Sequence, residues 1–326
     1  MIMLSNPILK VDQLTKKYHG ITVIDDVSFS VEKGEVVGLL GPNGAGKSTA
    51  LNIIVGLLDA TSGNVEVCGN SVAYDSHLIR KHIGFMPEKN PLPEKLRVGE
   101  FLRLRATLKG IPKKLVRLHV EKLMRMTDIF RKARYRIIGT LSKGYRQRIG
   151  ITDAFLGDPD LILLDEPTIG LDPHQMIIFR DLIETFRGKK TMLISSHILS
   201  EIDALCDRII IINHGNLVAN GSISELRNRF IRHRSMEVKV LCDISIIDKF
   251  KHSVHGCVFS EINSDIDLNI HEFSIIIDGD AEPLDIREKI VRYTEWKLLE
   301  MVEKKLSLEE IFLMATERCW DNQNLL

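Results

Sequence analysis

Residues 41–48 read Gly-Pro-Asn-Gly-Ala-Gly-Lys-Ser, and this stretch decides the fold. It matches the pattern G-x-x-x-x-G-K-[ST] and lies between a predicted strand at 35–40 and a predicted helix at 47–57. Glycines let the backbone curl until successive N–H groups face a phosphate, and the helix that begins there adds the positive end of its dipole. The pattern therefore predicts a phosphate-binding loop. In it, Lys47 would reach the β- and γ-phosphates of a nucleotide, and the Ser48 hydroxyl would bind Mg²⁺.

A second chemical signal stands at residues 161–166, which read Leu-Ile-Leu-Leu-Asp-Glu. The apolar run is continuous rather than alternating, which is typical of a strand covered on both faces in a parallel sheet. Two carboxylates, Asp165 and Glu166, follow directly. A nucleotide with Mg²⁺ needs an anionic metal partner and a group that activates water. We therefore expect Asp165 to hold the metal and Glu166 to act as the general base.

Strand-like and helical segments alternate up to about residue 230, which is the order of an α/β domain with a parallel sheet. The middle of this region turns helical, and we place an inserted helical subdomain at about 90–157. The strands are expected at 23–31, 35–40, 65–68, 161–164, 191–195 and 208–212, and the helices at 47–57, 98–109, 113–127, 173–186 and 198–205.

The pattern changes after about residue 230, where short strands and helices follow in the order βαββαβ. This order favours a small ferredoxin-like α+β domain with one further helix after it. We predict two domains, 1–230 and 231–326. The strands are expected at 236–241, 254–260, 271–278 and 296–302, and the helices at 244–251, 282–294 and 307–316.

The overall composition is that of a globular protein. The 326 residues contain 27% charged and 44% hydrophobic residues, which argues against disorder and against a fibrous repeat. The five cysteines are far apart and follow no metal-ligand spacing, so neither a disulfide framework nor a zinc site is indicated. No apolar run approaches the roughly 20 residues of a membrane-spanning helix, and the start lacks a signal-peptide pattern. We expect a cytoplasmic chain.

The charges are unevenly distributed although they cancel over the whole chain. Lysine plus arginine and aspartate plus glutamate each number 44. Residues 95–148 carry 17 basic and 3 acidic residues, a net charge of +14, whereas residues 241–326 carry 9 basic and 18 acidic residues, a net charge of −9. The basic block suits an anionic lipid leaflet, an acidic protein surface or nucleic acid, and the simpler interpretation is a set of solvated helix faces.

Four further elements carry a family resemblance. Residues 141–148 read Leu-Ser-Lys-Gly-Tyr-Arg-Gln-Arg, residues 168–172 read Thr-Ile-Gly-Leu-Asp, residues 195–197 read Ser-Ser-His, and Tyr18 lies upstream of the phosphate loop. In this order, over roughly residues 5–230, the chain resembles the nucleotide-binding subunit of ATP-binding cassette (ABC) transporters. The resemblance implies a P-loop NTPase fold of the ABC type that binds ATP and Mg²⁺. A GTPase is disfavoured because no Asn-Lys-x-Asp motif for guanine is present.

The resemblance implies a role for each matching residue. Tyr18 would stack on adenine, and Asp172 lies in the loop that crosses the subunit interface. The signature loop would open a helix with Ser142 as N-cap and close over the γ-phosphate held by the opposite subunit. The implied catalytic residues are Lys47, Glu166 and His197, the last contacting the γ-phosphate. The implied metal ligands are Ser48 and Asp165, and the implied ATP contacts are Tyr18, Gly41, Pro42, Asn43, Gly44, Ala45, Gly46, Lys47, Ser48, Thr49, Glu88, Ser142 and Gly144.

Two motifs depart from the usual family pattern. Lys143 and Tyr145 replace the third and fifth residues of Leu-Ser-Gly-Gly-Gln, and Glu88 stands where the family has a glutamine. A carboxylate cannot donate a hydrogen bond as an amide can, and it adds negative charge beside the metal site. Both variants, and the segment 307–313, resemble ATP-binding subunits of the ABC-2 export type, including gliding-motility and sodium-export-like members.

The resemblance implies an ATP hydrolase that works as a pair, with two identical or two different subunits clamped over shared ATP. Closure on ATP would drive a separate membrane permease, and the chain would sit at the inner face of the cell membrane. No nucleic acid is expected. The alternatives are a soluble ABC ATPase that acts on ribosomes or nucleic acid, and a non-catalytic nucleotide-gated regulator. The intact Lys47, Asp165, Glu166 and His197 disfavour the regulator.

Overall fold

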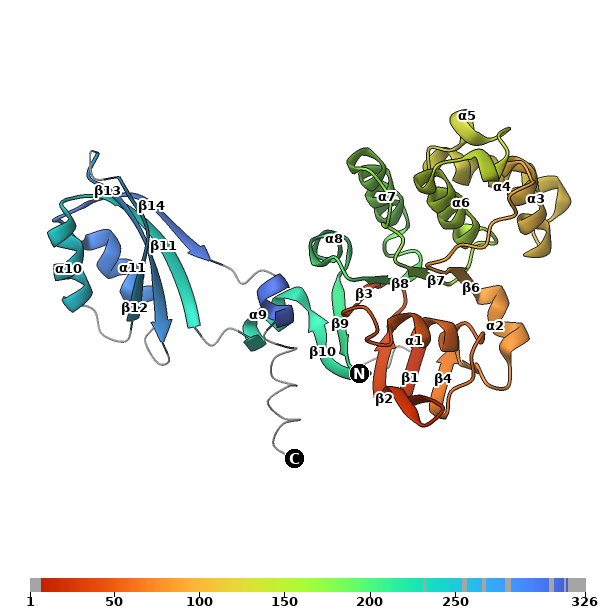
Figure 1. The fold of residues 1–326 in the computed structure, drawn as a ribbon, viewed down its shortest axis with the longest axis horizontal. Helices are drawn as coiled ribbons and strands as arrows, with labels where there is room; N and C mark the ends of the chain where they lie inside the picture. Colours follow the sequence, from red (N-terminus) through yellow and green to blue (C-terminus); the bar gives the residue numbers. More distant parts are fainter. Residues whose placement is uncertain are drawn as a thin grey trace, which may run out of the picture. The chain divides into compact units, whose positions relative to one another are not determined.

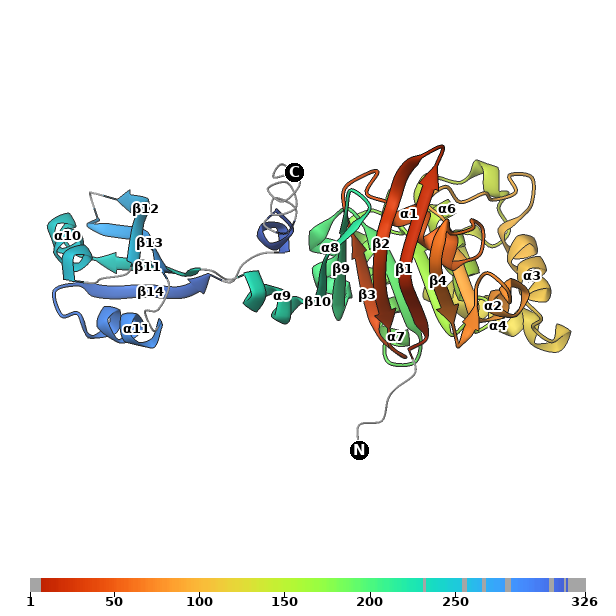
Figure 2. The same ribbon diagram turned by 90° about the horizontal axis from the view of Figure 1, so that it is seen from below.

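A computed structural model describes residues 7–230, 233–253, 257–265, 268–278, 283–304, 308–313 and 315. The chain divides into two compact units (Figures 1 and 2). The first runs up to Ile223 and also includes Ala315, and the second is Ser224–Met314. No helix in these ranges is both long enough and apolar enough to cross a bilayer.

A six-stranded sheet forms the centre of the first unit. All neighbouring strands are parallel except the pair β9 and β10, which is antiparallel. Every residue of β3 and β7 is buried, as the continuous apolar runs predicted. The strand order is β10-β9-β3-β8-β7-β6, and the strands are β3 (Val36–Leu40), β6 (Ile83–Met86), β7 (Leu161–Asp165), β8 (Thr191–Ser196), β9 (Arg208–Asn213) and β10 (Asn216–Ser222).

The parallel arrangement brings the predicted motifs to one edge of this sheet. The phosphate loop follows β3, Glu88 follows β6, Asp165 ends β7, and His197 follows β8. Ligands of open α/β sheets bind outside the carboxyl ends of the strands, where these four segments emerge. The fold therefore collects residues that are far apart in the sequence.

A second, antiparallel sheet packs on the helix that follows the phosphate loop. This helix, α1 (Lys47–Ile54), contributes Leu51 and Ile54 to one buried cluster that also contains Val27 of the antiparallel sheet and Leu163 of the parallel sheet. The order is β2-β1-β4-β5, and the strands are β1 (Leu9–Tyr18), β2 (Ile21–Val31), β4 (Ser62–Val67) and β5 (Asn70–Ser71).

Arg208 of β9 connects the two sheets directly. Its guanidinium donates to Glu35 Oε1 at 2.6 Å and to the backbone carbonyl of Ser30 in β2. The Arg208 and Glu35 side chains are each 18% exposed, so the ion pair is largely protected from water. A protected pair between guanidinium and carboxylate is stronger and more directional than a surface pair.

The inserted segment is helical, as predicted. In α4, Val116, Val120 and Leu123 recur at helical spacing and are buried, as is the C-cap residue Thr127. Helix α6 lies deepest, with Arg148 donating to the carbonyl of Thr127 at 3.2 Å. The helices of the segment are α3 (Val98–Leu108), α4 (Lys113–Met126), α5 (Phe130–Ala133) and α6 (Lys143–Phe155), and the other helices of this unit are α2 (Ser76–His82), α7 (Pro173–Phe186) and α8 (Leu199–Leu205).

The second unit has the predicted βαββαβ order and is ferredoxin-like. Its four strands are all antiparallel in the order β12-β13-β11-β14, and the tilted rings of Phe250 and Trp296 pack in the core with their centres 4.4 Å apart. Helix α9 (Ile223–Phe230) comes before this βαββαβ segment in the chain. The elements are β11 (His233–Leu241), α10 (Ile244–Ser253), β12 (Cys257–Asp265), β13 (Ile270–Asp278), α11 (Pro283–Arg292) and β14 (Lys297–Lys304).

Three predicted elements of the C-terminal region lie partly outside the described residues. The affected parts are residues 254–256 of the strand expected at 254–260, residue 282 of the helix expected at 282–294, and both ends of the helix expected at 307–316. Residues 308–313 and 315 are helical.

Candidate nucleotide-binding and catalytic site

The phosphate loop requires glycine at two positions. Gly46 is the N-cap of α1 with φ 107°, and a Cβ there would lie 2.9 Å from the carbonyl oxygen of Val23. A Cβ at Gly41 would lie 2.3 Å from the carbonyl oxygen of Ile212. Both distances are shorter than van der Waals contact, so the loop closes against β2 and β9 only because these residues have no side chain.

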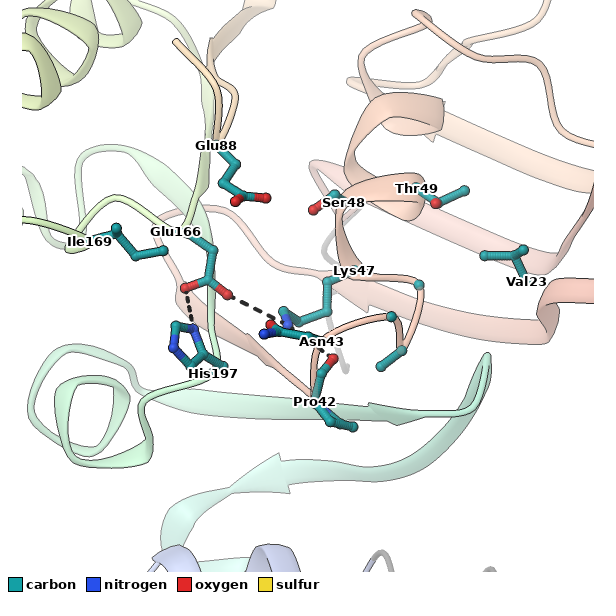
Figure 3. A pocket seen from close by; sticks show the side chains of 13 residues that line it. Val23, Pro42, Asn43, Lys47, Ser48, Thr49, Glu88, Glu166, Ile169 and His197 are labelled. Atoms are coloured by element: carbon teal, nitrogen blue, oxygen red, sulfur yellow. Dashed lines mark hydrogen bonds and ion pairs between the residues drawn. The ribbon is translucent and has the colours of Figure 1, made fainter.

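An open pocket of about 330 Å³ lies over this loop (Figure 3). It receives residues from β2, the phosphate loop, the segment after β6, the segment after β7 and the end of β8. Its lining consists of Val23, Pro42, Asn43, Gly44, Ala45, Gly46, Lys47, Ser48, Thr49, Glu88, Glu166, Ile169 and His197.

Glu166 is the centre of the pocket's charged groups. Its Oε1 lies 3.5 Å from Nζ of Lys47, and its Oε2 lies 2.8 Å from Nδ1 of His197. The Lys47 and Glu166 side chains are each 6% exposed, whereas that of His197 is 39% exposed. Lys47 also donates to the carbonyl of Gly41 at 2.7 Å, so its ammonium is held inside the curl of the loop. The structure thus brings the three predicted catalytic side chains together.

The backbone of Glu166 is held in an uncommon conformation by its neighbours. Its φ of 50° is in the left-handed region, which a residue with a side chain adopts at a cost of roughly 1–2 kcal/mol. Its N–H donates to Ser195 Oγ at 3.0 Å, and its carbonyl accepts from Gln147 Nε2 at 3.0 Å and from the N–H of Ile169 at 3.4 Å. These contacts fix the direction in which the carboxylate enters the pocket.

Oxygen ligands that fit Mg²⁺ are present in the pocket at Ser48 and Glu88, whereas Asp165 does not itself line the pocket. Asp165 is 2% exposed, and its Oδ1 accepts a hydrogen bond from Ser195 Oγ. Figure 3 shows the Glu88 carboxylate directed toward the Ser48 hydroxyl. Hydroxyl and carboxylate oxygens are the ligands that Mg²⁺ prefers, and Glu88 contributes one more negative charge than a glutamine would. Ser195 links the Asp165 carboxylate to the backbone N–H of Glu166, a role that its place in the sequence did not predict.

Four predicted ATP contacts lie outside this pocket, namely Gly41, Tyr18, Ser142 and Gly144. Tyr18 is 38% exposed at the end of β1, where the Lys16 ammonium lies 4.9 Å from its ring centre. Ser142 is the N-cap of α6 as predicted, but its side chain makes no capping hydrogen bond. Gly144 is buried, and a Cβ there would lie 3.0 Å from the carbonyl oxygen of Gly170. The signature loop therefore packs on the segment that follows Glu166 rather than lining its own chain's pocket.

The two unusual signature residues have defined surroundings. The aliphatic part of Lys143 covers Gly170, whose Cβ would lie 3.0 Å from Lys143 Cδ. The Tyr145 ring lies 4.5 Å from the buried guanidinium of Arg148, a cation–π contact. Asp172 is the N-cap of α7 and accepts from the N–H of Gln175 at 2.8 Å. Each variant therefore packs without disturbing the course of the loop.

A glycine-rich loop at a helix N-terminus, with a buried lysine and the carboxylates of a neighbouring parallel strand, defines the P-loop nucleoside triphosphatases. The family profile described as ABC transporter matches residues 24–169. The chain is 35% identical to the Nod factor export ATP-binding protein I of Ralstonia nicotianae, over 68% of this chain and 69% of that protein. It is 38% identical to the ABC transporter ATP-binding protein NatA of Bacillus subtilis, over 63% of this chain and 84% of that protein.

Solved structures agree with these relatives. An ATP-binding subunit of an ABC transporter superposes with a TM-score of 0.65 at 32% identity, over 68% of this chain and 93% of that one. A dimeric ATP-binding cassette in a post-hydrolysis state with ADP and Pi superposes with a TM-score of 0.60 at 27% identity, over 66% of this chain and 98% of that one. The chain belongs to the ABC transporter family as an ATP-binding subunit, and it is an ATP hydrolase.

Proposed function

We propose that the chain powers a separate membrane permease of the ABC-2 export type, as one of a pair of ATPase subunits. The observation that carries the proposal is the buried Glu166 carboxylate, which faces the phosphate loop between Lys47 and His197. The names of the relatives support export, because two Nod factor export ATP-binding proteins, from Ralstonia nicotianae and Burkholderia orbicola, are among the similar proteins.

The pairing follows from what one chain leaves uncovered. Pro42, Asn43 and Gly44 are exposed on the outer side of the phosphate loop. The signature residue Ser142 is exposed too, at the N-terminus of α6, and does not line the same pocket. A second copy can place its own helix end over the open side, where N–H groups and the helix dipole add stabilisation for the γ-phosphate. Dimeric cassettes among the structural relatives support this arrangement.

Each side chain of the pocket then has a task. Lys47 binds the terminal phosphate oxygens and offsets the charge that develops on them. Glu166 accepts a proton from the attacking water, and His197 orients the Glu166 carboxylate through the 2.8 Å contact. Ser48 and Asp165 would hold Mg²⁺, which when bound neutralises the negative charge shared by the β- and γ-phosphates. Tyr18, Ser142 and Gly144 are proposed as adenine and signature contacts.

Replacing Glu166 by glutamine tests the chemistry. Glu166→Gln should bind ATP, hydrolyse it about 10²–10⁴-fold more slowly and accumulate as an ATP-bound dimer, because the amide cannot accept the proton. The matched control is Glu184→Gln on α7, whose side chain is 55% exposed and outside the pocket. Turnover and size-exclusion mass should match the wild type in that control. Near-normal turnover in Glu166→Gln would remove Glu166 from the role of base.

The basic block at residues 95–148 is proposed to face the permease and the inner leaflet. Some of its charges are neutralised internally, as in the pair between Arg105 and Asp153 at 2.8 Å. We expect reversal of several exposed charges to weaken copurification with membranes while ATPase activity in solution is unchanged. Unchanged membrane association would contradict this proposal, and the basic block would then be explained only as a set of solvated helix faces.

The same basic block favours a second candidate, a soluble ABC ATPase that acts on ribosomes or nucleic acid. Phosphate contacts would give this activity a strong dependence on salt concentration. Affinity purification from membranes in mild detergent separates the two candidates. A copurifying integral membrane protein supports the exporter, and salt-sensitive nucleic-acid binding without such a partner supports the alternative.

A further inference from the structure

Three side chains with metal-ligating atoms lie together at the opposite edge of the parallel sheet from the nucleotide pocket. Cys68 directly follows β4, His82 is the last residue of α2, and Asp160 directly precedes β7. The ligating atoms of the three side chains all lie within 4.8 Å of one another. Nδ1 of His82 is already 2.6 Å from Oδ2 of Asp160. Three different segments of the chain thus converge on one point.

The backbone fixes this convergence independently of the side chains. The N–H of Asp160 donates to the carbonyl of His82 at 3.0 Å, at the position where β6 and β7 begin to pair. The N–H of Cys68 donates to the carbonyl of Ile8 at 2.8 Å, and Cys68 has a φ of 51° as the chain turns away from β4. The donor atoms are therefore held near one another by the ends of paired strands.

We propose that Cys68, His82 and Asp160 bind a divalent transition-metal ion of the zinc type. Sulfur, imidazole nitrogen and carboxylate oxygen are the ligands that zinc takes in proteins, and bond lengths of about 2.0–2.3 Å with tetrahedral angles place such ligands about 3.5 Å apart. The His82 and Asp160 side chains are 41% and 49% exposed, so small rotations close the site. Three protein ligands leave a fourth position for water.

Binding requires one proton to leave the site. Burial raises the pKa of the Cys68 thiol and the charge of Asp160 raises it further, while Lys33 lowers it. The thiol is therefore protonated in the metal-free chain at neutral pH. When the metal–sulfur bond forms, the S–H bond breaks and the proton passes to solvent, with no change in oxidation state.

The site would connect parts of the fold that carry the catalytic groups. His82 and Asp160 precede β6 and β7, and the other ends of these strands lead to Glu88 and Glu166. Cys68 belongs to the antiparallel sheet, so a bound ion would join that sheet to both strands. The spacing of the cysteines could not indicate such a site, because only one of its ligands is a cysteine. The other two, His82 and Asp160, are 78 residues apart in the sequence.

Cobalt titration of the full-length, nucleotide-free chain tests the proposal. A Co²⁺–thiolate bond gives a charge-transfer absorption band that oxygen and nitrogen ligands at the nucleotide site cannot produce. We expect one Co²⁺ per chain with this band, displaced by Zn²⁺, and release of about one proton on binding. The matched control is Cys257→Ser, at a half-buried free cysteine in the second unit, which should keep the band.

Cys68→Ser should abolish the band, and His82→Gln and Asp160→Asn should each weaken Co²⁺ binding at least about tenfold. Circular dichroism of each metal-free variant shows whether it is folded. If Cys68→Ser is not folded, Asp160→Asn replaces it as the test, because the asparagine keeps a polar contact with His82. Absence of a thiolate band at saturating Co²⁺ would overturn the proposal. So would a band that survives in Cys68→Ser. ATP turnover is not a readout here, so this outcome is independent of the proposed transport function.

Discussion

Gln147 provides a test of how the signature helix controls the catalytic carboxylate. Gln147 lies on α6, is 5% exposed, and donates its amide to the carbonyl of Glu166 at 3.0 Å. Gln147→Leu keeps the approximate volume and removes this donor. Loss of a buried hydrogen-bond partner costs about 1–3 kcal/mol. The Glu166 carbonyl keeps its 3.4 Å hydrogen bond from the N–H of Ile169. We therefore expect the loss of the Gln147 amide to cost about 1–2 kcal/mol.

This loss is comparable to the roughly 1–2 kcal/mol needed to hold Glu166 in its left-handed conformation. Without the amide, the backbone can relax toward negative φ, and the carboxylate then points away from its place beside Lys47. If the left-handed conformation of Glu166 becomes less favourable by 1–2 kcal/mol, we expect kcat to fall about 5- to 30-fold. The KM for ATP should stay close to wild type, because Gln147 does not line the pocket.

The assay is steady-state ATP hydrolysis together with urea unfolding. Thr152→Val is the matched control, because Thr152 lies on the same helix, is fully buried, and donates to the carbonyl of Arg148 at 2.7 Å without contacting Glu166. It should lower the free energy of unfolding by about 1–2 kcal/mol and leave kcat unchanged. Equal losses of kcat in both variants, or an unchanged kcat in Gln147→Leu, would refute the positioning role.

Three further predictions concern other parts of the chain. Gly46→Ala should abolish nucleotide binding in a fluorescent-ATP assay, because a Cβ would lie 2.9 Å from a backbone carbonyl at φ 107°, whereas Gly110→Ala on the open surface should bind normally. Burial lowers the pKa of Lys109 from 10.5 to about 8, so the unfolded chain holds this proton up to higher pH. The free energy of unfolding of the wild type should therefore rise relative to Lys109→Met between about pH 8 and 10.5, and a flat difference would contradict this. Phe250→Ala should destabilise the second unit by about 3–5 kcal/mol in chemical unfolding without lowering ATP turnover, and a parallel loss of turnover would show that the units are coupled.

Most helices and buried strands could be predicted because each has its own local signal. Helix α7 begins at Pro173 and ends at Phe186, the bounds that the sequence analysis predicted. Four strands of the first unit were not predicted, namely β1, β5, β6 and β10. For two of them the structure shows a physical reason. β6 is four residues long and contains Gly84, where a Cβ would lie 1.9 Å from the carbonyl oxygen of Ala154 in α6. In β1, register shifts after Val11 interrupt the alternation of apolar residues.

The site residues that could be predicted are those that lie within short sequence motifs. Three short motifs supply the predicted site residues: the phosphate loop, Asp165 with Glu166, and the segment that contains His197. The parallel sheet brings these motifs to one edge. The supporting contacts of Ser195 and Gln147 depend on how β8 and α6 pack beside β7, which no local pattern encodes. Val23 reaches the pocket from the antiparallel sheet for the same reason.

The Arg208 bridge determines which parts of the ATPase unit can rotate. Val23 lines the pocket from one sheet and the phosphate loop from the other, and Arg208 links these sheets through Ser30 and Glu35. The two walls of the pocket therefore belong to sheets that are tied to each other. The helical insertion joins this part of the fold at two connections, after β6 and before β7. A hinge at those connections would carry the signature loop away from its neighbour while leaving each bound nucleotide seated.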